Sequence, residues 1–202
     1  LDTNTSGTLR FIASGTSWTA SFSGVSRISI VNGPINIAPK EFTLEGGSGS
    51  RVTILGGGAN RLRAGATSSN SRLVLKGNIT ASGLEINGTN ANAANNLQIG
   101  QNASAHDVTM QKGAYAQVLA GGRKTNIAIN GTASLKTAGQ SYVSGVTISG
   151  TQSETASAMI NGEGHDFKVH AGARLDVGMN GAVRDVTVNS GGILQAADGG
   201  SV

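Results

Sequence analysis

The sequence repeats with a period close to 19 residues, and this period restricts the fold more than any other feature. An alternating apolar triplet recurs five times along the second half of the chain, at successive steps of 19, 19, 21 and 19 residues. The triplets begin at Val108, Ile127, Val146, Phe167 and Val186. Period-2 alternation between glycine-rich turns, repeated about every 20 residues, is typical of stacked strands. We therefore expect an all-β fold, a β-solenoid with ~19-residue repeats, in which these five side chains form one core column.

A second apolar pair follows eight and ten residues after each triplet begins. Its members are Ala116/Val118, Leu135/Thr137, Leu175/Val177 and Leu194/Ala196. The Val146 unit has Glu154 at this position instead, and its two extra residues predict a bulged corner around Gly150 to Glu154. Leucine-rich repeats and calcium-dependent β-rolls have similar periods, but their consensus patterns are missing.

Composition supports one elongated domain over residues 1–202, with 31 glycines and only 13% charged residues. Residues 1–100 are less regular and cap-like, whereas 101–202 hold the regular repeats. We expect about nine to ten rungs at roughly 4.8 Å each, with Thr89 to Asn96 projecting as a loop. The absence of cysteine excludes disulfides, thiolate metal sites and a cysteine nucleophile.

Aromatic residues gather near the N-terminus, at Phe11, Trp18, Phe22 and Phe42. Two interpretations are open. The aromatic side chains could plug the exposed end of the solenoid, which a stack of strands requires against edge pairing. Alternatively, Trp18 could be part of a platform on which sugars stack.

The excess positive charge lies entirely in the first half of the chain. Residues 1–101 carry eight basic and four acidic side chains, and the remainder carries seven of each. Five basic residues follow one another without an intervening acid: Arg51, Arg61, Arg63, Arg72 and Lys76. They predict a patch for polyanions or for an acidic partner face; the alternative is a solvated face that blocks edge-on aggregation. Nucleic acid is not expected, because no recognition motif accompanies the patch.

A polar or glycine residue directly precedes each triplet, forming a second periodic set. Its members are Asp107, Asn126, Gly145, Asp166 and Asp185, and in register they would form a ladder along one corner. Turn-forming side chains explain this composition; a weak calcium site or a self-association site is the alternative. The three histidines lack zinc-site spacing, so we expect neither a metal nor a cofactor.

Catalytic motifs are missing from the sequence. It contains no nucleophile elbow, P-loop or dinucleotide fingerprint. The pair Glu163/Asp166 has no identifiable partner carboxylate elsewhere. We therefore expect no enzyme activity.

The last repeat resembles a known family. Thr-Val-Asn-Ser-Gly-Gly at 187–192 and Leu-Gln-Ala-Ala-Asp-Gly-Gly at 194–200, with the 19-residue step, look like the repeats of self-associating autotransporter adhesins of Gram-negative bacteria, the group of the diffuse-adherence adhesin and antigen 43. The match is strong for this rung, degenerate in the other repeats and weaker over residues 1–100.

This resemblance implies that the solenoid is a right-handed parallel β-helix. It also implies a passenger domain that is exported through its own C-terminal β-barrel, which is not in this chain, and displayed at the cell surface. It implies cell-cell aggregation, biofilm formation and host attachment, with a like passenger on a neighbouring cell and a host-surface glycan or protein as partners. In some members a heptosyltransferase attaches heptose to Ser or Thr, and the outward hydroxyls here are predicted at Thr109, Thr147, Thr187 and Ser190. The alternative function is a polysaccharide-processing β-helix enzyme, a lyase or hydrolase, or a tailspike-like protein.

Overall fold

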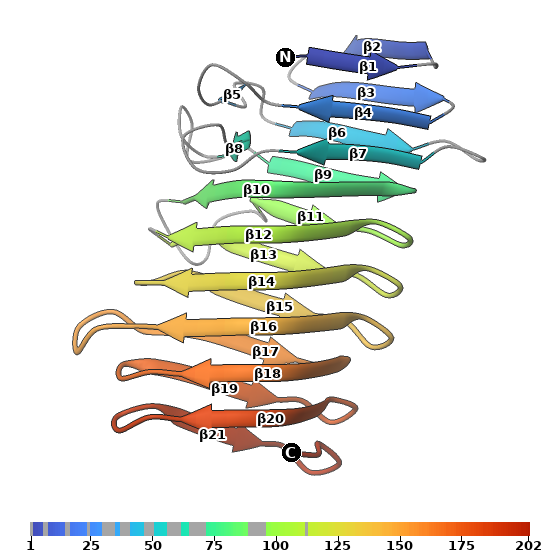
Figure 1. Ribbon diagram of the computed structural model, residues 1–202. Helices are drawn as coiled ribbons and strands as arrows, with labels where there is room; N and C mark the ends of the chain where they lie inside the picture. The colour runs from blue at the N-terminus through green and yellow to red at the C-terminus, as the bar shows by residue number, and fades with distance from the viewer. Residues whose placement is uncertain are drawn as a thin grey trace.

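The computed structural model is a stack of strands arranged in two sheets (Figure 1). The first sheet contains, in spatial order, β1 (Asp2–Thr5), β4 (Val25–Ser29), β7 (Arg51–Leu55), β10 (Ile79–Asn87), β12 (Ser104–Gln111), β14 (Arg123–Asn130), β16 (Tyr142–Ser149), β18 (Glu163–Val169) and β20 (Ala182–Val188), with β5 (Ile35–Asn36) and β8 (Leu62–Ala64) joined beside β10. The second contains β2 (Thr8–Ser14), β3 (Ser17–Ser23), β6 (Glu41–Gly46), β9 (Arg72–Gly77), β11 (Leu97–Ile99), β13 (Tyr115–Val118), β15 (Ser134–Thr137), β17 (Ala156–Ile160), β19 (Ala173–Val177) and β21 (Ile193–Ala196).

The structure describes residues 72–88, 96–111 and 113–202, together with the backbone of the strands before residue 72. Side chains are described at 43–44, 73–88, 96–111 and 113–202. These parts contain strands and turns and no helix. Accordingly, a search of the described residues finds no helix with the length and apolar character needed to span a membrane.

Long and short strands alternate along the chain from β10 onward. Each long strand pairs in parallel with the next long strand, and each short strand with the next short one. As the chain descends in Figure 1, the long strands in front run to the left and the short strands behind run to the right. This sense of coiling makes the solenoid right-handed, as expected for parallel crossovers. The predicted fold class is confirmed.

The long strands bend within their length, which gives each turn three sides. In β12, Ala105 and Val108 are both buried, while the intervening His106 and Asp107 face outward. Two consecutive outward residues shift the alternation by one position, and Asp107 there has a φ of 52°. The first half of the strand, its second half and the following short strand therefore form the three faces.

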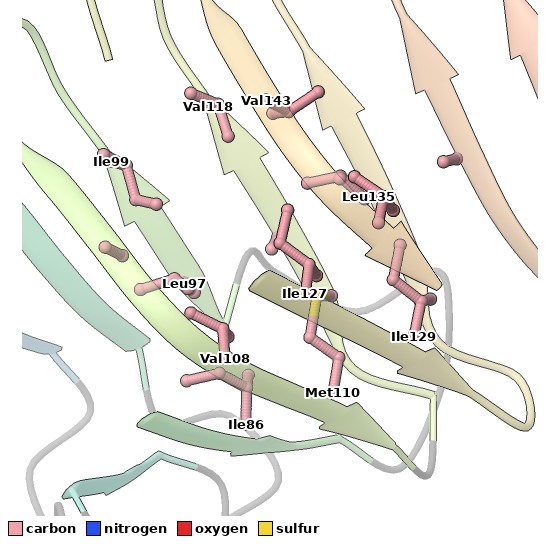
Figure 2. Close-up of a cluster of buried hydrophobic side chains, with 14 of the residues drawn as sticks. Ile86, Leu97, Ile99, Val108, Met110, Val118, Ile127, Ile129, Leu135 and Val143 are labelled. Atoms are coloured by element: carbon pink, nitrogen blue, oxygen red, sulfur yellow. The ribbon is translucent and has the colours of Figure 1, made fainter. Parts of the chain in front are cut away.

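The predicted core column is present. Backbone register joins Leu84, Val108, Ile127, Val146, Phe167 and Val186 in adjacent strands. Val108, Ile127, Val146 and Phe167 are buried, and Val186 is partly buried against the same cluster. Figure 2 shows Val108 and Ile127 among the inward-pointing side chains of this core. A one-residue slip would turn such a column outward, so the register is strongly specified.

Phe167 is the one aromatic residue of this column and needs extra room. Gly164, in the same strand, supplies it: a Cβ there would lie 2.6 Å from Cζ of Phe167. The corresponding position in the preceding strand is Val143. The large residue and the missing side chain therefore compensate each other within one turn, which keeps the core closely packed.

The turn containing β17 departs from the prediction. The sequence suggested two extra residues near Gly150 to Glu154, but β17 begins only at Ala156, and Ala158 takes the position of Leu135 and Leu175. Leu135 follows Ile127 by eight residues, whereas Ala158 follows Val146 by twelve, so this loop holds four extra residues. The next corner is two residues shorter, because β17 ends at Ile160 and β18 begins at Glu163.

Thr137 accounts for the shortened corner. Its side chain is buried at a position where other turns have Val118 or Val177. Its Oγ1 accepts hydrogen bonds from the backbone amides of Asn161 at 2.9 Å and Gly162 at 3.3 Å. The hydroxyl thus satisfies amides that the tight corner would otherwise bury without partners.

The N-terminal end is built differently. β1 pairs with β4, and β2 with β3, in antiparallel fashion, whereas the later ladders are parallel. The side chains of Phe11, Trp18, Phe22 and Phe42, on which the plug and platform interpretations depend, lie outside the described residues. So do residues 89–95 of the expected loop. Asn96, assigned to that loop, is instead buried, and its backbone amide donates to the carbonyl oxygen of Tyr115 at 2.8 Å.

A lysine lies inside the coil. Lys124, on β14, belongs to a column with Ala105, Val143 and Val183 and is completely buried. Its Nζ lies 3.2 Å from Sδ of Met110, and a thioether is a weak acceptor. Burial lowers the pKa of Lys124 to about 7.

Candidate functional site

The residue set that precedes the triplets forms a continuous ladder at the bend of the long strands. Every member has a positive φ: 52° at Asp107 and Asn126, 62° at Gly145, 57° at Asp166 and 56° at Asp185. The left-handed region is open to glycine and tolerated by asparagine and aspartate. The bend therefore explains the choice of residues, as the turn-forming interpretation predicted.

The side chains of the ladder are exposed and contact one another sparsely. Nδ2 of Asn126 donates to Oδ1 of Asp107 at 3.2 Å. Asp166 and Asp185 occupy neighbouring rungs at the exposed corner. A search of the described residues finds no group of three or more His, Asp or Glu side chains placed to hold a metal ion.

A shallow groove of about 370 Å³ runs along this corner. Its lining combines four members of the ladder with residues of the adjoining strand halves, of which Thr109, Ala128, Thr147 and Lys168 face outward. The complete set is Asp107, Val108, Thr109, Asn126, Ile127, Ala128, Gly145, Thr147, Asp166 and Lys168. Gly145 and Ala128 leave the groove open because they are small. We call it the corner groove.

Three of the four predicted glycosylation acceptors lie in one outward column beside the corner. Register joins Thr109, Ala128, Thr147, Lys168 and Thr187 in successive strands. Thr109 and Thr147 are half-buried and line the corner groove, whereas Thr187 is exposed. The fourth acceptor, Ser190, is exposed in the turn after β20.

Four of the five N-terminal basic residues lie on described strands, and these strands belong to two different sheets. Arg51 and Arg63 belong to β7 and β8 of the first sheet, whereas Arg72 and Lys76 belong to β9 of the second. Lys76 is exposed. Arg61 and the side chains of the other three lie outside the described residues.

Acidic residues occupy the paired backbone positions of three of these basic residues. Backbone register pairs Arg63 with Glu85, Arg72 with Glu41 and Lys76 with Glu45. Opposite charges at directly paired positions attract. The five basic residues have no acid between them in the sequence, but in the structure three of them have an acid at the paired position of an adjacent strand.

A second hollow, of about 420 Å³, is lined by the first halves of β16, β18 and β20 and by the last two residues of the sequence, Ser201 and Val202. Tyr142, Glu163, His165, Ala182 and Arg184 are among the residues that line it. Sequence reasoning did not single out this set, because its members are separated by about 20 residues and differ in type. The signal available was their shared 19- to 21-residue register.

Comparisons with known proteins return little. No family model and no curated protein matches the chain. A solved structure, the TibC-catalysed, hyper-glycosylated TibA fragment, is similar at 14% sequence identity and a TM-score of 0.33, over 89% of this chain and 90% of that one. Similarity at this level does not assign a function.

Proposed function

We propose that the protein is a non-enzymatic adhesin, displayed on the surface of a Gram-negative bacterium, whose rod binds sideways to a like rod or to a host-surface glycan or protein. The supporting observation is the register of the solenoid. It places outward residues of successive turns in straight columns, such as the one from Thr109 through Thr147 to Thr187. Rows of polar side chains at roughly 4.8 Å intervals suit repeated weak contacts along a flat surface.

Such contacts gain strength from their number. A single rod-to-rod contact with a millimolar dissociation constant corresponds to only about 4 kcal/mol. Many copies on two cells bind together because each contact raises the effective concentration for the next. Cell-cell aggregation, biofilm formation and host attachment are the expected consequences of this mode of binding.

The alternative, a polysaccharide-processing enzyme, requires two carboxylates close together across a substrate. In the corner groove, Asp107 and Asp166 are three rungs apart, or roughly 14 Å along the axis at 4.8 Å per rung. The carboxylates of glycoside hydrolases stand about 5 to 9.5 Å apart. Asp107 and Asp166 are therefore too far apart to act as such a pair.

A clumping assay of cells that display the protein tests the proposal. We expect clumping, and we expect it to weaken as salt rises, because exposed charges are screened within about 8 Å at physiological ionic strength. Replacing Arg51, Arg61, Arg63, Arg72 and Lys76 by serine should abolish the salt dependence if these residues make the contact.

A second variant probes the ladder. Asp107→Asn, Asp166→Asn and Asp185→Asn together remove three charges while keeping residues that tolerate a positive φ. If the five-residue variant clumps as before and the ladder variant does not, the contact is assigned to the corner groove. Cells that do not clump with the unaltered protein, and do not adhere to host cells, would contradict the proposed function.

Heptose attachment is a further part of the proposal. In protein made with a heptosyltransferase, Thr187 and Ser190 should be modified more fully than Thr109 and Thr147, because the latter two are half-buried and leave less room for a sugar. Intact mass spectrometry with and without the transferase measures occupancy. A mass of 20.2 kDa under both conditions would exclude modification of this chain.

A further inference from the structure

The corner groove contains a gap at Gly145, the ladder position that has no side chain. The rungs on either side carry Asn126 and Asp166, so the gap spans two rung spacings, or roughly 10 Å at 4.8 Å per rung. In the adjacent outward column, Ala128 contributes only a methyl group. The lining residues come from β12, β14, β16 and β18, and the strands β10 and β20 flank them in the sheet. The gap is therefore built by interior turns of the stack.

The amide of Asn126 is oriented by its neighbour in the ladder. Its Nδ2 donates to Oδ1 of Asp107 at 3.2 Å. An ionised carboxylate can only accept, so the amide oxygen of Asn126 is left to face away from Asp107. A Cβ at Gly145 would lie 2.9 Å from this oxygen, which places it at the gap. Among the described residues no donor bonds to it, so it is a free acceptor.

Asp166 supplies a second acceptor from the opposite side of the gap. It is exposed, and within the part of the chain that the structure describes its carboxylate has neither an ion pair nor a side-chain hydrogen bond. Asp176 on the second sheet differs, because both its carboxylate oxygens accept from Nε of Arg174 at 2.8 Å. The hydroxyl of Thr147, half-buried in the adjacent column, lines the same groove. This set suits a ligand with a positive charge and several hydrogen-bond donors.

We propose that the corner groove binds an amino sugar unit of a polysaccharide, with the sugar ammonium at Asp166 and sugar hydroxyls at Asn126 and Thr147. Asp107 and Asp166 outnumber Lys168 in the lining, and this negative excess matches a free amine rather than a uronate or a sulfate. The groove volume of about 370 Å³ is within the roughly 300 to 1,000 Å³ typical of small-molecule sites. The proposal rests on the proposed adhesive function and names the class of glycan that this corner of the rod recognises.

Titration of the isotopically labelled chain, followed by NMR below neutral pH, tests the site. The probe is chitotriose, a fully deacetylated glucosamine trimer whose amines are protonated. We expect it to shift the amide signals around Gly145 and Asp166, with a dissociation constant of about 1 mM. The tri-N-acetylated form is the neutral control and should bind about fivefold more weakly or not at all, because the charge pair is lost. A trilysine with blocked ends carries the same charge without sugar hydroxyls and should also bind about fivefold more weakly.

Four variants separate the site from general charge effects. Gly145→Asn should block binding, because it fills the gap with a side chain that Asn126 already carries at a positive φ. Asp166→Asn should weaken binding of chitotriose by about fivefold. Lys168→Gln removes a repelling charge from the same groove and should strengthen binding. Glu154→Gln removes a charge from the exposed loop before β17, outside the groove, and should leave binding unchanged.

Absence of shifts for chitotriose at about 10 mM, equal binding of the blocked trilysine, or equal weakening by Asp166→Asn and Glu154→Gln would overturn the proposed site. Undiminished binding by a folded Gly145→Asn variant would overturn it as well, and circular dichroism checks the fold. Clumping and host-cell adherence of displayed protein are measured separately. Their persistence beside a failed titration would reject this site and leave the adhesive function standing. Their loss in the unaltered protein would reject the function itself.

Discussion

Replacing Ile127 by aspartate is expected to lower the free energy of unfolding by several kcal/mol, on the order of 3 to 5. Ile127 is 2% exposed and lies between Val108 and Val146 in the core column. The substitution removes apolar burial and introduces a carboxylate without a partner in a dry core. Urea unfolding followed by circular dichroism measures the change.

The same strand supplies a matched control. Ala128, the next residue, faces outward into the corner groove. Ala128→Asp therefore adds the same carboxylate on the solvent-facing side of the strand. Thr147→Ala, in the same outward column, removes a hydroxyl without touching the core. Each should change stability by about 0.5 kcal/mol or less. Equal losses for Ile127→Asp and Ala128→Asp would contradict the assignment of inside and outside.

The core column was predictable because one physical requirement recurs at every turn. Val108, Ile127 and Val146 must each face the interior, and strands stacked in register force the same spacing on all of them. The ladder was predictable for a similar reason. A bend with positive φ selects Asp, Asn or Gly, so Asp107 and Gly145 share a position despite their different chemistry.

The shortened corner near Thr137 could not be predicted from the sequence, because the changes in loop length before and after β17 partly cancel. Four residues gained before Ala156 and two lost before Glu163 give the same net 21-residue step as a simple two-residue bulge. The structure locates the shortened corner between Ile160 and Glu163, where the amides of Asn161 and Gly162 donate to Thr137.

The candidate sites were less predictable than the core, because surface residues are free of the periodic requirement. The run of N-terminal basic residues appeared continuous in sequence, but Arg63 and Arg72 belong to different sheets. The second hollow brings together Tyr142, Glu163 and Arg184, which differ in residue type, so neither composition nor period indicates it.

Lys124→Met is expected to raise the free energy of unfolding at neutral pH by about 2 to 4 kcal/mol. Lys124 is fully buried, and burial lowers its pKa from 10.5 to about 7. The charged form of the buried amine is therefore disfavoured, which destabilises the fold at neutral pH and below. The repeat could also have predicted that Lys124 faces the core, since residue 124 shares the 19-residue register of Ala105 and Val143.

The pH dependence of this effect follows from the direction of the pKa shift. Because the folded-state pKa of Lys124 lies below the unfolded value, the unfolded chain binds more protons between about pH 7 and 10.5. Stability should therefore rise with pH across this window, and the destabilisation should be complete below it. In Lys124→Met, residue 124 no longer contributes to the change of stability with pH. The difference in unfolding free energy between the variant and the unaltered protein should therefore shrink steadily as the pH approaches 10.5.

Lys136→Met provides the control, because Lys136 is exposed on β15 and the same substitution there should change stability by about 0.5 kcal/mol or less. The measurement is a series of urea unfolding curves for both variants and the unaltered protein across the pH window. Other titrating groups, including Tyr115, whose pKa burial raises, contribute equally to all three proteins and cancel in the differences. A constant difference between Lys124→Met and the unaltered protein at every pH would mean that the amine is solvated in the folded state. Lys124 would then have to reach water, and the column of Ala105 and Val143 could not be closed around it.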